Sequence, residues 1–457
     1  MSPPRRQVAI IGGGIAGVTA AWQLARSGTV DATLFEASPR LGGTIETHQR
    51  DGFTIECGPD GWVSEKPWAR ELANELGLAG ELIESNDAGR VTYILSHGKL
   101  VAIPDGMRMM VPTDLSALHS SSLFSEEARQ HYAAEPTRAD ELRTSAPEHD
   151  ESVSAFVSRH FGHEVLTKIA APLLSGIFGG DVGTLSVRAV MPTFVQMERE
   201  HGSLIKALQT RTGSPQHAIF TSLRSGVETL VQRMVEEIPA NWVRLQTPVR
   251  NLRQSGFEWL VEGSDMIHRF DAVMLAAPAQ VASRLLAPLL PQIPGLLVQE
   301  STSAVVAALA FKEEFALPKG FGFLVPAGEA SALLACTFVD QKFPCRTPDR
   351  CRLLRAFFGG ASAPHIANHT DDEIAALALR ELASILGHLP APAFTVVRRW
   401  PLSLPQYAVG HLERTRELDQ LTRELPSLWL LGNAYRGVGL PDLIRDARAA
   451  AQNLLTR

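Results

Sequence analysis

Three glycines near the start of the chain have the spacing of a dinucleotide-binding turn. Gly12, Gly14 and Gly17 take the first, third and sixth places of a G-x-G-x-x-G motif within residues 8–17. In such a motif the first glycine allows a tight turn, the second lets the backbone approach a pyrophosphate, and the third lets a helix pack closely on a strand. Glu36 follows where a carboxylate can bind a ribose 2′-hydroxyl and would repel a 2′-phosphate. These residues predict a site for an adenine dinucleotide.

The flanking sequence predicts the elements that hold this motif. The apolar run 8–11 predicts a buried strand, 18–26 a helix that ends at Gly28, and 31–35 a second strand that leads to Glu36. The N-terminus of that helix would offer free N–H groups and a partial positive charge to the phosphates. The motif alone does not choose between NAD and FAD.

The C-terminal part of the chain repeats the pattern. Residues 428–431 predict a buried strand, 432–439 form a glycine-rich loop, and Pro441 stands where a helix to 455 would begin. A second helix N-terminus aimed at the cofactor would place positive potential near the N1–O2 edge of a flavin, where reduction builds negative charge. This second loop favours FAD over NAD.

The segment after Glu36 carries a second set of residues suited to a ligand. Gly42 and Gly43 permit a backbone turn close to a ligand, and Arg40 can neutralise phosphate charge. The alternative is a surface turn with a solvated arginine. A short strand at 53–56 then leads into the turn-rich loop 58–62.

Composition excludes several classes of protein. The chain has 457 residues and a formal net charge of −6, which does not suit a nucleic-acid-binding surface. Its 4 cysteines show no paired C-x-x-C spacing, so we expect reduced thiols in a cytoplasmic protein and no metal site. The histidines at 48, 97, 160, 163 and 201 are expected to be surface or structural residues. No apolar run approaches the ~20 residues of a spanning helix, so any membrane contact would be peripheral.

The remaining sequence predicts a helical region and a strand-rich region. Residues 105–210 carry helical periodicity with clusters of Met and Leu, and 211–216 predict a turn. Other predicted elements are hairpins at 91–103 and at 257–262 with 266–270, a helix at 371–386, and strands at 242–249, 272–277, 304–311, 333–339, 352–358 and 394–400.

Several longer stretches resemble one family of flavoproteins. They are 40–43, 57–61, 150–157, 172–181, 185–186, 399–411 and 432–442. Together with the N-terminal motif they resemble the FAD-dependent amine oxidase/phytoene desaturase superfamily, and within it the oxygen-dependent protoporphyrinogen/coproporphyrinogen oxidase family. The runs 172–181, 399–411 and 432–442 carry the narrower match, which extends over nearly the whole chain.

The resemblance implies a mixed α/β and α+β architecture in three parts. A Rossmann-like FAD-binding domain would comprise 1–90, 211–277 and 425–457, an α+β substrate domain 91–104 and 278–424, and an inserted helical, membrane-associating subdomain 105–210. The FAD would be non-covalent, because the loop 432–442 has no cysteine. The predicted cofactor contacts are Gly12, Gly13, Gly14, Ile15, Ala16, Gly17, Glu36, Ala37, Arg40, Gly43, Thr44, Gly58, Pro59, Asp60, Gly61, Val249, Trp400, Val438, Gly439 and Leu440.

The family reaction implied here oxidises a porphyrinogen to a porphyrin in haem biosynthesis. Six electrons leave the macrocycle in three flavin turnovers, and dioxygen reoxidises the flavin to give hydrogen peroxide. No catalytic acid or base is expected. The main prediction is protoporphyrinogen IX, and the alternative is coproporphyrinogen III. Lys66 is expected to contact a propionate, although mitochondrial and plant enzymes place an arginine where this chain has Val63.

Three other functions stay open from the sequence. A flavin amine oxidase would share both ends of the chain, a carotenoid desaturase-like enzyme would bind a polyene at a membrane, and a flavin-binding assembly factor of haem synthesis would have no activity. The oligomeric state is expected to be a monomer or a homodimer.

Overall fold

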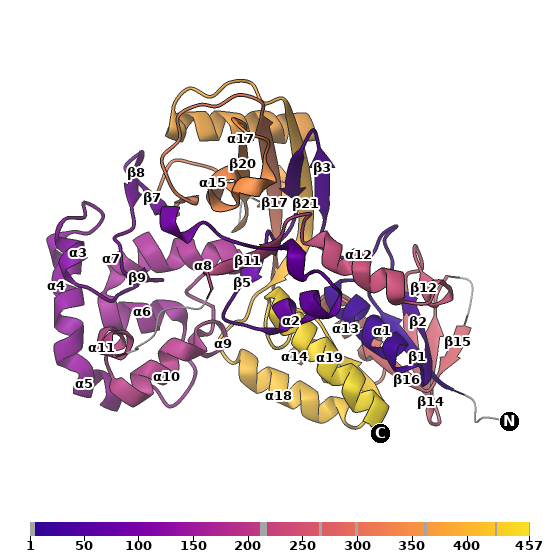
Figure 1. Cartoon of the computed structure of the whole chain (residues 1–457). Coiled ribbons are helices and arrows are strands. Elements are labelled where there is room, and N and C mark those ends of the chain that lie inside the picture. Colours follow the sequence, from indigo (N-terminus) through magenta and orange to yellow (C-terminus); the bar gives the residue numbers. More distant parts are fainter. Residues whose placement is uncertain are drawn as a thin grey trace. The chain divides into compact units, whose positions relative to one another are not determined.

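The chain folds into two compact units, each built from segments that are distant in sequence (Figure 1). The computed structural model describes residues 5–210, 217–264, 267–297, 300–360, 363–425 and 427–456. The first unit comprises Met1–Ser85, Ile219–Glu300 and Glu413–Arg457, and the second comprises Asn86–Ala218 and Ser301–Leu412. The turn predicted at 211–216 and the start of the strand predicted at 266 lie outside the described residues.

The first unit is organised around a five-stranded parallel sheet. Apolar runs buried on both faces form its central strands, as expected for parallel β-structure covered on two sides. The strand order is β12-β2-β1-β16-β22. The bounds are β1 (Arg6–Ile11), β2 (Val30–Phe35), β12 (Val243–Arg244), β16 (Ala272–Leu275) and β22 (Leu428–Leu430). The strands predicted at 8–11, 31–35 and 428–431 are confirmed, and the one predicted at 272–277 is present but ends at Leu275.

The strand predicted at 242–249 is wrong in length. Only Val243–Arg244 pairs with β2. Gln246 then adopts a φ of 52°, and the amides of Gln246 and Thr247 donate to the carbonyl oxygens of Ser38 and Glu36 at 3.0 and 2.8 Å. The backbone is therefore bonded to the loop beyond β2 instead of continuing the ladder.

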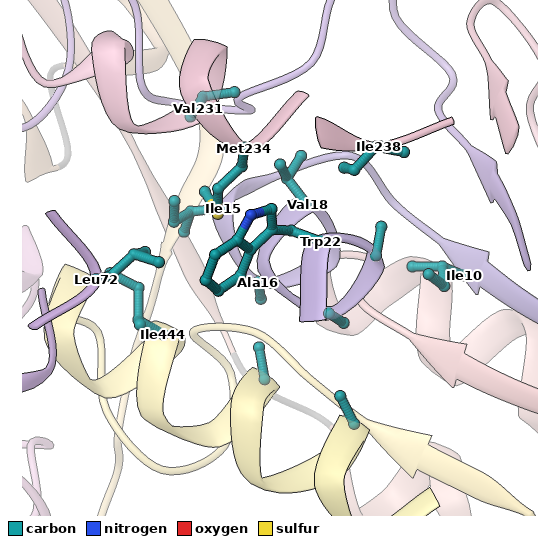
Figure 2. Close-up of a cluster of buried hydrophobic side chains, with 14 of the residues drawn as sticks. Ile10, Ile15, Ala16, Val18, Trp22, Leu72, Val231, Met234, Ile238 and Ile444 are labelled. Atoms are coloured by element: carbon teal, nitrogen blue, oxygen red, sulfur yellow. The ribbon is translucent and has the colours of Figure 1, made fainter. Parts of the chain in front are cut away.

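Helices cover one face of this sheet around Trp22. They are α1 (Ile15–Ser27), α2 (Trp68–Glu75), α12 (Glu228–Glu237) and α19 (Leu440–Thr456). Figure 2 shows the Trp22 indole in a cluster with Leu72, Met234 and Ile444. Trp22 has no exposed surface, and its Nε1 donates to Glu237 at 2.8 Å. Its polar atom is thus satisfied while the ring fills the core.

The other face is covered by a small sheet and two helices. These are β13 (Asn251–Ser255), β14 (Glu258–Glu262), β15 (Ile267–Phe270), α13 (Ala279–Leu286) and α14 (Ile293–Leu296). Pro278 ends the run after β16 and is the N-cap of α13, whose Ala282, Leu285 and Leu286 are buried against this face. Residues 278–300 and 413–424, which the sequence analysis gave to a substrate domain, therefore pack in the first unit. The three-part division itself stays a prediction.

The rest of the first unit consists of short elements that carry loops. A hairpin joins β3 (Thr47–Arg50) and β4 (Phe53–Glu56), a three-stranded sheet has the order β5-β11-β6, and one further helix precedes β22. Their bounds are β5 (Trp62–Val63), β6 (Leu82–Glu84), β11 (Phe220–Leu223) and α18 (His411–Thr422). Helix α18 is not among the elements predicted from the sequence.

The second unit contains a seven-stranded mixed sheet in the order β21-β17-β20-β19-β18-β7-β8. Helix α17 (Asp371–Leu386) packs its Ile374, Ala378 and Leu382 against the sheet. Thr370 and Glu373 form a capping box at its start, which explains why its bounds were predictable. The strands are β7 (Thr92–Ser96), β8 (Lys99–Ala102), β17 (Ser301–Phe311), β18 (Gly322–Leu324), β19 (Ala335–Phe338), β20 (Arg352–Phe358) and β21 (Phe394–Pro405).

Short helices occupy most of the segment 105–210 in the same unit. They are α3 (Ser116–His119), α4 (Glu126–Ala134), α5 (Ala139–Thr144), α6 (Val153–Phe161), α7 (His163–Val165), α8 (Ala171–Phe178), α9 (Val187–Val190), α10 (Pro192–His201) and α11 (Leu204–Gln209), with a small ribbon of β9 (Met107–Arg108) and β10 (Val111–Pro112) before them. Met110, Leu118, Leu123 and Phe124 are at most 3% exposed. These four apolar residues form core, whereas Met107, Met109 and Leu115 of the same segment are only partly buried. The association of this segment with a membrane stays a prediction. Within the described part of the chain, no helix has the length and hydropathy to cross a bilayer.

A charged network lies buried among these helices. His160 is 1% exposed, and its two ring nitrogens face Glu135 and Glu198 at 3.1 and 3.0 Å. Arg159 binds Glu198 and Glu151 from the adjacent position.

Candidate functional site

The glycine turn between β1 and α1 leaves no room for side chains at two positions. Gly12 has a φ of 109°, and a Cβ there would lie 2.5 Å from the carbonyl oxygen of Ala276. A Cβ at Gly17 would lie 1.9 Å from the carbonyl oxygen of Gly12. The first and third glycines of the motif are therefore required by close backbone packing.

The middle glycine faces open space instead. A Cβ at Gly14 would meet no described atom within 4 Å. Gly14 is also the N-cap of α1 and has no side chain to cap the helix. The N–H groups of the first turn, beginning at Ile15 and Ala16, are thus available to an anion at the positive end of the helix dipole.

Glu36 is held beside this turn by backbone amides. Its Oε2 accepts a hydrogen bond from the Gly13 amide at 2.6 Å, and its Oε1 accepts one from the Ser38 amide at 2.7 Å. These bonds orient the carboxylate at the end of β2, where an adenosine ribose is bound in this type of fold. Val249 lies in the loop after β12 with its side chain 6% exposed.

Arg40 does not point freely toward a ligand. Its Nη1 donates to the carbonyl oxygens of Leu41 and Ile45 at 3.1 and 2.8 Å, and its Nη2 donates to that of Gly43 at 2.5 Å and to Glu46 at 3.1 Å. The guanidinium is therefore hydrogen-bonded to its own loop. The sequence predicts instead that Arg40 contacts a phosphate of the cofactor.

This loop in turn packs directly on the glycine motif. The Gly42 amide donates to the carbonyl oxygen of Gly13 at 2.8 Å, and a Cβ at Gly43 would lie 3.1 Å from the Cα of Gly14. The loop bound by Arg40 is thus part of the wall of the proposed cofactor cradle.

The segment 58–61 packs against the backbone of Thr44. A Cβ at Gly58 would lie 1.8 Å from the carbonyl oxygen of Thr44, and one at Gly61 would lie 2.4 Å from that of Thr221. Ser222 Oγ donates to the carbonyl oxygen of Asp60 at 2.7 Å. The predicted residues 12–17, 36–37, 40–44 and 58–61 thus belong to one continuous group of loops.

The C-terminal loop is fixed by Asp442, whose role the sequence analysis missed. Asp442 stands in the first turn of α19 with a side chain 6% exposed. Its Oδ2 lies 2.6 Å from Lys66 Nζ, and its Oδ1 lies 3.4 Å from Arg445 Nη1. A Cβ at Gly437 would lie 2.7 Å from the Cβ of Asp442. An acidic residue in a first helical turn is the sequence signal that could have drawn attention to it.

Tyr435, in the C-terminal loop, and the predicted contact Trp400 lie in different places. Tyr435 is 2% exposed, and burial raises the pKa of its hydroxyl, so it stays neutral. Trp400 lies in β21 of the second unit, and its contact with a flavin stays a prediction, as do the contacts of Val438, Gly439 and Leu440.

The fold and this group of loops define an adenine-dinucleotide-binding protein. The features are a parallel sheet, a glycine turn with an open anion position, and a carboxylate at the end of the second strand. The chain belongs to the flavin containing amine oxidoreductase family, whose sequence model matches residues 15–455, and its cofactor is FAD. The open position at Gly14 and the oriented carboxylate of Glu36 suit the pyrophosphate and ribose of that cofactor.

Individual relatives match over nearly the whole chain. Coproporphyrinogen III oxidase of Bacillus subtilis strain 168 is 34% identical over 100% of this chain and 99% of that protein. The chloroplastic protoporphyrinogen oxidase of Nicotiana tabacum is 27% identical over 97% of this chain and 84% of that protein. A crystal structure from Exiguobacterium sp. 255-15 superimposes with a TM-score of 0.88 at 30% identity, covering 99% of both chains.

Proposed function

We propose that the protein oxidises coproporphyrinogen III to coproporphyrin III, with FAD as cofactor and dioxygen as final acceptor. The observation that carries this proposal is the 34% identity with the Bacillus subtilis coproporphyrinogen III oxidase over essentially both full lengths. The match to the tobacco protoporphyrinogen oxidase is lower, at 27%, and leaves more of that protein unmatched. The alternative substrate of the sequence analysis is therefore better supported than its first choice, protoporphyrinogen IX.

The overall reaction removes six electrons and six protons from the macrocycle and reduces three dioxygen molecules to hydrogen peroxide. When bound, FAD supplies the group that accepts hydride from carbon. The chain's own task is to hold that cofactor and position the macrocycle. The first turn of α1 binds the pyrophosphate, Glu36 binds the ribose, and the loop fastened by Arg40 forms a wall beside both.

The test compares two porphyrinogens on the FAD-loaded protein by the fluorescence of the porphyrin that forms. We expect kcat/KM for coproporphyrinogen III to exceed that for protoporphyrinogen IX by about tenfold or more, a difference of about 1.4 kcal/mol in transition-state binding. A preference for protoporphyrinogen IX would contradict the proposed substrate. Hydrogen peroxide release with amines, and none with either porphyrinogen, would replace the whole proposal by an amine oxidase, which the family description keeps as the second function.

Cytoplasmic location, peripheral membrane contact and a monomeric or homodimeric state belong to the same proposal. They rest on the sequence and stay predictions.

A further inference from the structure

Three side chains with metal-binding atoms meet on one face of the β3–β4 hairpin. Glu46 directly precedes β3, His48 lies within it, and Cys57 directly follows β4. The Cys57 amide donates to the carbonyl oxygen of Glu46 at 2.8 Å, which places these two residues opposite each other across the hairpin. His48 is two residues from Glu46 and so shares its face of the strand.

The donor atoms converge closely. A carboxylate oxygen of Glu46, a ring nitrogen of His48 and the sulfur of Cys57 all lie within 4.8 Å of one another. The opposite face of the same hairpin is fixed by other contacts, because Thr47 Oγ1 donates to Glu56 Oε2 at 2.7 Å and the Val227 amide donates to Glu56 Oε1 at 2.9 Å. These hydrogen bonds hold in place the hairpin that carries the three donor residues.

We propose that Glu46, His48 and Cys57 form a binding site for a divalent transition metal ion, with Zn²⁺ as the best match. Zinc takes thiolate, imidazole and carboxylate ligands at about 2.0–2.3 Å in a tetrahedral arrangement, and three protein ligands leave the fourth position to water. Hard cations such as Mg²⁺ and Ca²⁺ prefer all-oxygen sites and do not suit a thiol.

Small movements would complete the geometry. His48 Nε2 is now hydrogen-bonded to Glu46 Oε1 at 2.6 Å. Around a tetrahedral ion two such donors stand roughly 3.3 Å apart, so the imidazole needs to withdraw by under about 1 Å. The His48 side chain is 38% exposed and can move, whereas Cys57 is only 2% exposed and is the buried ligand of the site.

Arg40 holds the second oxygen of Glu46 and so orients the first. Its Nη2 lies 3.1 Å from Glu46 Oε2, which leaves Oε1 on the side of His48. Partners of this kind fix ligand orientation at metal sites. On binding, the Cys57 thiol becomes a thiolate and releases its proton to solvent, and its charge and that of Glu46 balance the metal.

The test is equilibrium dialysis of the FAD-loaded protein against Zn²⁺, followed by metal analysis, with Cd²⁺ as a second probe. We expect about one Zn²⁺ per chain, together with the ultraviolet charge-transfer band of a cadmium–thiolate bond. Cys57→Ser and His48→Gln should each weaken binding by about tenfold or more, and Cys57→Ser should abolish the cadmium band. Cys345→Ser is the matched control, because Cys345 is exposed, and it should leave both signals unchanged.

His48→Gln keeps the experiment decisive if Cys57→Ser fails to fold, since His48 is partly exposed. The thermal midpoint and FAD content of each variant establish that it is folded. Failure to bind Zn²⁺ at about millimolar concentration, or binding that survives in both site variants, would overturn the proposal. Loss of binding in Cys345→Ser would overturn it as well.

Discussion

Lys66 Nζ lies 2.6 Å from Oδ2 of Asp442, although the two residues are 376 positions apart in the chain. Lys66 follows the 58–61 loop, and Asp442 lies in the first turn of α19, with its side chain close to the backbone of Gly437. The Asp442 amide also donates to the carbonyl oxygen of Gly439 at 3.0 Å. The ion pair therefore ties the N-terminal loops of the first unit to the C-terminal glycine loop, and both are predicted to contact the flavin.

The first prediction separates two roles for Lys66. If Lys66 acts by holding Asp442 in an ion pair, the Lys66→Met variant should bind FAD about fivefold more weakly. A partly exposed ion pair of this kind contributes about 1 kcal/mol to the free energy of binding. The KM for porphyrinogen should then stay close to wild type. Titration of the apoprotein with FAD, followed by flavin fluorescence, measures the first quantity, and steady-state kinetics at saturating FAD measures the second. Lys99→Met, at an exposed lysine of β8, is the control.

The opposite pattern would support the contact with a propionate that the sequence analysis expected. In that case FAD affinity would be unchanged, and KM would rise by about tenfold because a charge-assisted bond to the substrate is lost.

The second prediction contrasts two glycines of the same motif. Gly14→Ala adds a methyl group where no described atom lies within 4 Å, at a φ of −69° that alanine adopts freely. The apoprotein should keep its thermal midpoint, while FAD binding falls by about tenfold or more because the methyl group occupies the approach of the pyrophosphate.

Gly17→Ala should behave differently, because its methyl group would lie 1.9 Å from the carbonyl oxygen of Gly12. We expect the apoprotein itself to lose about 2–3 kcal/mol of stability from overpacking. Thermal unfolding of both apoproteins, with bound FAD measured by absorbance, distinguishes the two. Equal losses of stability would contradict the open space at Gly14, and no loss in Gly17→Ala would contradict the close packing at Gly17.

The cofactor cradle could be predicted because its parts are local in sequence. Val8–Glu36 contains strand, turn, helix and carboxylate in one unbroken segment, and each is specified by residue type and spacing. The role of Arg40 could not be predicted in this way. An arginine that reaches a phosphate and one that folds back on the carbonyl oxygens of its own loop have the same sequence signature.

Contacts between residues distant in sequence, and contacts that depend on the backbone conformation, could not be predicted from the sequence either. The pairing of Lys66 with Asp442 depends on the packing of α2 and α19 against one core. The short β12 depends on the bonds that Gln246 and Thr247 make to another loop. The cluster of Glu46, His48 and Cys57 forms only when the hairpin pairs, since Cys57 is nine positions from His48 and shows no metal-ligand spacing.

The third prediction concerns the buried network of the second unit. Glu198→Gln should destabilise the protein by about 3 kcal/mol, because it leaves the buried His160 and the Arg159 guanidinium without one carboxylate. Glu200→Gln on the same helix is the control, since its side chain is 55% exposed, and it should change stability by less than about 0.5 kcal/mol. Chemical denaturation near neutral pH measures both.

The same variant should change the acid sensitivity of the fold. Burial alone would raise the pKa of Glu198, but hydrogen bonds from His160 and Arg159 outweigh it, and the pKa is lowered from its ordinary value of 4.5. A carboxyl group with a lowered pKa stabilises the fold above its unfolded value and loses that contribution as the pH falls through its folded value. The free energy of unfolding should therefore decline less in Glu198→Gln than in wild type between about pH 5 and pH 3. Parallel declines would show that Glu198 is not linked to acid unfolding.

The fourth prediction tests whether Arg40 acts by its shape or by its charge. Its guanidinium donates to three carbonyl oxygens of residues 41–45 and to Glu46, and only a planar fork of several donors can make all of these bonds. Arg40→Lys keeps the positive charge but loses the fork, so we expect it to weaken FAD binding nearly as much as Arg40→Ala does, by about tenfold.

A direct contact between Arg40 and a phosphate predicts a different result, because lysine also binds phosphate as a point charge. In that case Arg40→Lys would retain most of the affinity, and the wild-type affinity would fall more steeply with salt than that of Arg40→Ala. Measuring the FAD dissociation constant of the three proteins at two ionic strengths decides between the two roles, and Arg244→Lys, at an arginine in β12 of the same unit, is the control for a general effect of the substitution.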